Sequence, residues 1–168
     1  TLIWKASWRT EQMSIKMLVL SLTGQCNFAC RYCYAAEHDR SMMSPETALA
    51  AVKLAADGGE RFVIQFSGGE PLLNFDCLKA VVDYVHQEKI PAVLQLQTNG
   101  SLLTDKIAKY LYKRKVAIGV SLDGRPAVND KLRLKKNGYG ATGEILKGID
   151  VLRRNNIACG VTCVVTSE

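Results

Sequence analysis

Apolar residues along the chain follow two patterns that alternate. Five runs rich in β-branched residues have the length and spacing of β-strands, at 17–23, 61–67, 92–98, 116–122 and 157–166. Between them, four segments carry apolar residues at helical spacing, at 45–57, 75–89, 105–115 and 143–155. This alternation indicates βαβ units, so the sequence predicts an α/β fold with a parallel sheet of about five strands. Such a sheet either curls towards a barrel or stays open and doubly wound.

The predicted strands turn polar on one face near their C-terminal ends. Because side chains alternate across a strand, polar residues share a face within each strand: Gln65 with Ser67, Gln97 with Asn99, and Ser121 with Asp123. Parallel strands that serve only a core are usually apolar on both faces. We therefore expect a polar cavity at the C-terminal edge of the sheet, where α/β folds bind ligands.

Charge and cysteine content indicate which partners and which cellular compartment to expect. The net charge is +6, and basic residues gather at 113–115 and 131–136. These runs are either solvated helix ends and a loop, or a surface that attracts an acidic partner such as a peptide or a nucleic acid. No apolar run approaches the roughly 18 residues of a membrane span, so no membrane partner is expected. Six cysteines without a visible secretory signal indicate metal chemistry in a reducing, cytoplasmic setting.

Three cysteines directly follow the first predicted strand, with the spacing C-x3-C-x2-C: Cys26, Cys30 and Cys33. A loop at the edge of the sheet allows their sulfur atoms to turn towards one centre, and soft thiolates bind zinc or iron–sulfur clusters well. One alternative is a zinc-stabilised α/β binding module in which His38 supplies the fourth ligand. The other is a site whose fourth position stays open for a reactive ligand.

This motif, with Tyr32 before its last cysteine, resembles the signature of radical S-adenosylmethionine enzymes. The resemblance implies that three cysteines hold three irons of a [4Fe–4S] cluster, and that S-adenosylmethionine chelates the fourth. It also implies that one electron from the reduced cluster cleaves the cofactor to a 5′-deoxyadenosyl radical, which abstracts hydrogen from a substrate. The implied fold is an incomplete (β/α)6 partial barrel.

Further motifs extend the resemblance. The stretch Ser67-Gly68-Gly69-Glu70-Pro71, after the second predicted strand, resembles the family's GGE motif, which binds the amino group of the cofactor. Two glycines let the backbone approach a ligand closely, and a carboxylate complements an ammonium group. The resemblance places further cofactor contacts at the ends of later strands and near the adenine, at Asn99, Ser121, Asp123, Arg133 and Tyr32. Gln65 and Gln97, on the polar faces, are candidates for contact with substrate.

The other three cysteines are expected to be structural. Cys159 and Cys163 share a face of the fifth predicted strand with valines, on the side that is expected to face helices. Cys77 lies within the second predicted helix. None of the three has the spacing that a second cluster requires.

The motifs together look most like enzymes that modify peptides or proteins, such as anaerobic sulfatase-maturating enzymes and maturases of ribosomal peptides. The resemblance implies a peptide or protein substrate and an electron donor such as a flavodoxin or ferredoxin; a substrate that is RNA or a small molecule is the alternative. We expect a leader at 1–15 and a radical S-adenosylmethionine core at 16–168 that stops after the fifth strand. The exposed edge of that shortened sheet predicts self-association.

Overall fold

The strands form one parallel sheet whose spatial order follows the sequence. In the computed structural model, which describes residues 14–35 and 40–166, every neighbouring pair is parallel and the order is β1-β2-β3-β4-β5. The strands are β1 (Met17–Ser21), β2 (Phe62–Ser67), β3 (Ala92–Thr98), β4 (Ala117–Ser121) and β5 (Gly160–Thr162). Because right-handed crossovers in one direction put all helices on one face, the sheet curls as a partial barrel and is not doubly wound.

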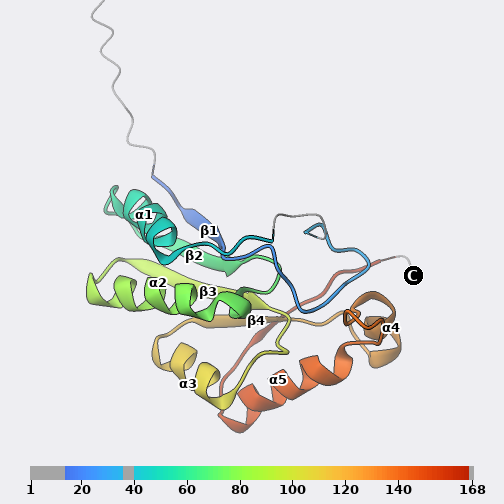
Figure 1. The fold of residues 1–168 in the computed structure, drawn as a ribbon. Coiled ribbons are helices and arrows are strands. Elements are labelled where there is room, and N and C mark those ends of the chain that lie inside the picture. Colours follow the sequence, from blue (N-terminus) through green and yellow to red (C-terminus); the bar gives the residue numbers. More distant parts are fainter. Residues whose placement is uncertain (1–13, 36–39, 167–168) are drawn as a thin grey trace, which may run out of the picture.

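The predicted helices are confirmed, and two short ones are added. The long helices are α1 (Pro45–Ala56), α2 (Phe75–Gln87), α3 (Asp105–Lys113) and α5 (Thr142–Arg154), and they lie along the sheet in Figure 1. Ser44 caps α1 by accepting a hydrogen bond from the Thr47 N–H at 3.2 Å. The additional elements are η1 (Pro71–Asn74) and α4 (Pro126–Leu132), neither of which has an apolar period long enough to predict.

The two faces of the sheet differ as the alternation predicts. Ile64, Phe66 and Val120 are fully buried against the helices. Gln65 and Gln97 lie on the opposite face and are partly exposed. The polar residues therefore line the concave side of the partial barrel.

The fifth strand is shorter than predicted. Its pairing with β4 covers only residues 160–162, where the prediction was 157–166. Beyond β4, the Asp123 side chain and not a backbone carbonyl accepts the Val164 N–H at 2.9 Å, which ends the ladder. The prediction that Cys163 is a core residue is wrong, since Cys163 is exposed and Cys159 only partly buried.

The exposure of Val161 shows why the prediction for Cys163 failed. Val161 pairs with Val120 on the helix-facing side of the sheet, but it is 59% exposed. All three residues of β5 are exposed. Cys77, in contrast, is fully buried as predicted.

Some predictions fall on residues that the structure does not describe. Most of the expected leader, including Trp4 and Trp8, lies outside the described residues, as does His38. Among the residues that are described, no helix has both the length and the apolar character needed to cross a membrane. β1 and β5 are the edges of the sheet, and self-association through an edge stays a prediction.

Candidate functional site

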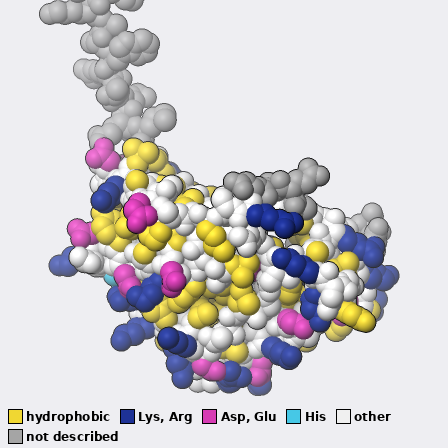
Figure 2. All heavy atoms as spheres, viewed as in Figure 1, with side chains coloured by type: hydrophobic (Ala, Val, Ile, Leu, Met, Phe, Trp, Pro, Cys, Tyr) yellow, Lys and Arg dark blue, Asp and Glu magenta, His cyan; other side chains and the backbone are white. Residues whose placement is uncertain are grey.

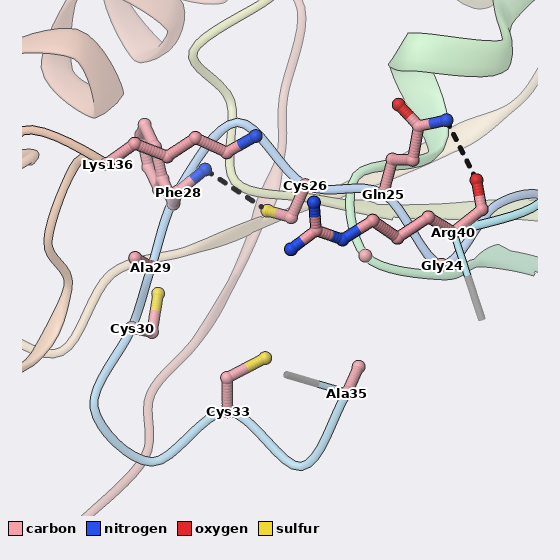
Figure 3. A pocket seen from close by; sticks show the side chains of 11 residues that line it. Gly24, Gln25, Cys26, Phe28, Ala29, Cys30, Cys33, Ala35, Arg40 and Lys136 are labelled. Carbon is pink, nitrogen blue, oxygen red and sulfur yellow. Dashed lines mark hydrogen bonds between the residues drawn. The ribbon is translucent and has the colours of Figure 1, made fainter. Parts of the chain in front are cut away.

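The three cysteines of the first loop line one cavity at the C-terminal edge of the sheet. This cavity has a volume of about 510 Å³ and takes part of its wall from Phe28, Ala35 and Gly69. Figure 3 shows the loop curving around the space, with the sulfur atoms of Cys26, Cys30 and Cys33 on its inner side. The structure thus brings together the four predicted site residues Cys26, Cys30, Cys33 and Gly69.

The two glycines of the second loop let it pack against the cysteine loop. A Cβ atom on Gly68, which has φ of +136°, would overlap the carbonyl oxygen of Thr23. A Cβ on Gly69 would overlap the carbonyl of Gln25. The Gly69 N–H donates to Thr23 O at 2.8 Å, so glycine is required by close contact between two backbones. The sequence analysis had explained the two glycines by a close approach of the backbone to a ligand.

The side chain of Glu70 points inward, away from the cavity. Its carboxylate is fully buried and accepts hydrogen bonds from the backbone N–H of Leu72 at 3.0 Å and of Asn99 at 2.8 Å. A third comes from the Thr98 hydroxyl at 2.7 Å. Burial raises the pKa of Glu70, and these hydrogen bonds lower it in part. The Glu70 carboxylate therefore ties the second loop to the end of β3, and its contact with the amino group of the cofactor stays a prediction.

The turn after β3 reaches the cysteine loop directly. The Asn99 amide donates to Asn27 Oδ1 at 2.9 Å and contacts Cys26 Sγ at 3.8 Å. Its own oxygen accepts the Ser101 N–H at 2.9 Å, which fixes the turn. Asn99 is thus placed beside a cysteine, and Asn27 is a partner that the sequence analysis did not single out.

A buried network joins the end of β4 to the cysteine loop. Arg133 donates to the Asp123 carboxylate at 2.9 and 3.1 Å, and the Tyr32 hydroxyl donates to the same carboxylate. The Arg133 guanidinium lies 5.5 Å from the centre of the Tyr32 ring. Although burial alone would raise the pKa of Asp123, hydrogen bonds from Tyr32, Val164 and Arg133 hold it below its usual range. These three predicted residues therefore contact each other, and they do not line the cysteine cavity.

The remaining predicted residues lie along the concave face. Gln97 donates to the Ser121 hydroxyl at 2.8 Å and accepts from Thr162 at 3.0 Å, which links three strands. Gln65 donates to the backbone carbonyl of Phe66 at 3.1 Å. Ser67, at the end of β2, pairs with Ser21 at the end of β1. These residues form a polar floor next to the cysteine cavity.

The cavity is also lined by two basic residues, which the sequence analysis had not assigned to the site. Lys136 and Arg40 extend over it in Figure 3, with their charged groups near Cys26. Both side chains are exposed, and neither has an ion pair in the described part of the chain. Lys136 belongs to the basic run 131–136, which the sequence analysis had noted as a possible surface for an acidic partner. No pattern in the sequence pointed to Arg40.

Burial favours the protonated form of two thiols in the cysteine loop. Burial raises the pKa of Cys26, and raises that of Cys30 to about 11 against the charge of Arg133. Metal binding would therefore displace protons from these thiols. Among the described residues, no three Cys, His, Asp or Glu side chains surround a position for a single metal ion. The sulfur atoms are instead spread around the cavity wall, and the suggested zinc ligand His38 is not described.

The fold is a partial α/β barrel, and its first loop carries three cysteines that line one cavity. The family model described as the Radical SAM superfamily matches residues 20–167. The chain therefore belongs to the radical SAM superfamily, as its motifs predicted.

Several individual proteins are similar to this chain over most of its length. The chain is 38% identical over 156 residues to an uncharacterized protein of Methanocaldococcus jannaschii, covering 92% of this chain and 54% of that protein. It is 29% identical over 167 residues to a cysteine-type anaerobic sulfatase-maturating enzyme of Clostridium novyi (92% and 45%). It is 32% identical over 156 residues to the Fe-coproporphyrin III synthase of Methanosarcina barkeri (90% and 37%).

A solved structure shows the same architecture. The structure described as native anSMEcpe with bound AdoMet and Cp18Cys peptide superposes with a TM-score of 0.78 at 25% identity. The match covers 91% of this chain and 44% of that one. The chain thus spans about half, or less, of the length of these relatives.

Proposed function

We propose that this chain is the catalytic core of a radical S-adenosylmethionine enzyme that acts on a peptide or protein. Cys26, Cys30 and Cys33 would hold a [4Fe–4S] cluster, with S-adenosylmethionine beside it. When bound, these groups supply the radical chemistry that removes a hydrogen atom from a substrate. The observation that carries the proposal is the set of three thiols on one cavity wall, closed by the two-glycine turn.

The residues of the chain have defined tasks in this proposal. The loops after β2 and β3 hold the cysteine loop in place through Gly69 and Asn99, and Phe28 and Ala35 keep water from part of the wall. Predicted contacts to the cofactor are Tyr32, Ser67, Gly68, Gly69, Glu70, Asn99, Ser121, Asp123 and Arg133. For Glu70, the carboxylate and the backbone N–H both have hydrogen-bond partners within the chain, so the predicted contact rests on its place in the GGE motif. Gln65 and Gln97 would meet the substrate on the polar floor.

The cationic rim suits an electron donor with an acidic surface. Lys136 and Arg40 border the cavity, and Arg31 is exposed on the same loop. Because opposite charges steer association, a flavodoxin or ferredoxin would approach at this side.

Two substrate classes are supported by relatives. A peptide is supported by the sulfatase-maturating relative and by the Cp18Cys peptide bound in the matched structure. A small molecule is supported by the 32% identity to a protein named Fe-coproporphyrin III synthase. We propose the peptide class because the matched structure shares the architecture over 91% of this chain.

The test begins with anaerobic reconstitution of the chain with iron and sulfide. We expect close to four irons and four sulfides per chain, and 5′-deoxyadenosine after reduction with S-adenosylmethionine. Single Ser substitutions of Cys26, Cys30 or Cys33 should abolish cluster binding, whereas Cys163→Ser, at an exposed cysteine, should not. One tightly bound zinc and no iron would overturn the proposal. Faster formation of 5′-deoxyadenosine with a tetrapyrrole precursor of Fe-coproporphyrin than with a sulfatase peptide would favour the small-molecule class.

A further inference from the structure

A second cavity lies at the opposite end of the sheet from the cysteine loop. It has a volume of about 360 Å³ and lies where β2, β3 and β4 begin. Its floor includes the apolar residues Ile90, Val93 and Leu94. Five basic side chains line it, and no acidic one among the described residues does: Arg61, His86, Lys89, Arg114 and Lys115. Figure 1 shows these loops at the left-hand end of the sheet, and Figure 2 shows Lys and Arg side chains over that end.

Most of this positive charge is not neutralised by the protein. Arg114 is paired with Asp83 at 2.8 Å. Arg61, Lys89 and Lys115 have no ion pair within residues 14–35 and 40–166. The C-termini of α2 and α3 end at this cavity, and each carries about half a negative charge. Two helix ends thus offset about one of the three unpaired positive charges, and an excess of about two remains.

The backbone at two of these lysines is unusual. Lys89 and Lys115 each lie one residue beyond the C-cap of α2 or α3, and they have φ of 53° and 54°. This left-handed conformation is costly for most side chains, and glycine or asparagine usually ends a helix in this way. Asn156, after α5, is the remaining described non-glycine residue with positive φ. Lysine at both positions keeps a cation on this cavity where glycine would make the turn more easily.

We propose that this cavity binds a small anion with two or more negative charges of the phosphate type. The basic groups come from three separate loops and meet at one apolar-floored hollow, so they surround a compact ligand. The arginine fork is suited to phosphate oxygens, and lysine adds point charges. The volume lies at the lower end of the range of small-molecule sites, which suits a compact oligoanion. The site is independent of the cysteine cavity and of the proposed catalytic function.

The experiment is calorimetric titration of the chain with inorganic pyrophosphate at low salt. We expect saturable binding that weakens as NaCl is added, because the contacts are ionic. The double variant Lys89→Gly with Lys115→Gly preserves the left-handed turns and should lower the affinity about tenfold or more, since it removes two of the three unpaired cations.

Two controls separate a built site from general charge. Asn156→Gly changes a left-handed residue that does not line the cavity, and Lys106→Gln removes an exposed charge elsewhere. Both should bind pyrophosphate as the unmodified chain does. Absence of saturable binding, or an equal loss in Lys106→Gln, would overturn the proposal. So would an RNA oligonucleotide that binds through the same lysines more tightly than pyrophosphate, since the ligand would then be a nucleic acid.

Discussion

Asp123 and Arg133 form a buried ion pair in which two guanidinium nitrogens reach the same carboxylate. Asp123 lies just beyond β4 and Arg133 just beyond α4, and the side chains are 0% and 8% exposed. The same carboxylate accepts hydrogen bonds from Tyr32 in the cysteine loop and from the Val164 N–H after β5. One side chain therefore ties the loop that carries the proposed cluster ligands to three later parts of the chain.

Asp123→Asn should destabilise the protein strongly. The substitution leaves the Arg133 charge buried without its counter-ion, which costs about 3–5 kcal/mol. Urea unfolding at neutral pH measures this change in the free energy of unfolding. The matched control is Asp150→Asn, because Asp150 pairs with Arg153 at an exposed site where such a pair contributes at most about 1 kcal/mol. Equal losses in the two variants would show that Asp123 does not tie the loops together.

Gly69→Ala should disturb the cysteine loop. The added methyl group would overlap the Gln25 carbonyl, so one of the two loops must move, at a cost of about 1–3 kcal/mol. We expect a lower melting temperature and a lower iron content after anaerobic reconstitution. Gly143→Ala is the control, since open space surrounds Gly143 in the first turn of α5. Normal iron binding by Gly69→Ala would refute the inferred contact between the loops.

Periodicity predicted most of the fold, since each long helix and four of the five strands follow clear apolar patterns. It did not predict α4, whose seven residues span too few turns to show a period. The length of β5 depends on where its partner strand ends, which its own sequence does not encode.

The sequence also predicted part of the candidate site. Three cysteines and Gly69 meet at one cavity as expected. The orientation of Glu70 and the pairing of Arg133 with Asp123 depend on contacts between loops distant in sequence, so residue types alone could not predict them.

Glu70→Gln should weaken the link between the second loop and β3. An amide has one acceptor oxygen, so in either orientation its NH2 group would face the backbone N–H of Asn99 or of Leu72. An unsatisfied buried donor costs about 1–3 kcal/mol. Urea unfolding measures the loss, and the amide NMR signals of Asn99 and Leu72 should shift. Glu144→Gln, at a partly exposed pair with Lys135, should lose less; a smaller effect at Glu70 would contradict the proposed role of its carboxylate.

We expect the stability of the protein to depend on pH through the carboxylate of Asp105. Hydrogen bonds from Arg154, with Nε to Oδ1 at 3.0 Å, and from Asn155 hold the pKa of Asp105 well below its usual range. A lowered pKa in the folded state stabilises the protein above the unfolded pKa of about 3.9, and this contribution is lost as the pH falls below it. Asp105→Asn should therefore lower the urea midpoint at pH 7, and the difference from the unmodified chain should shrink towards pH 3. Asp76→Asn is the control, because Asp76 lies in the first turn of α2 and has no ion pair among the described residues. A midpoint difference that stays constant from pH 7 to pH 3 would show that the pairing of α3 with α5 does not depend on this charge.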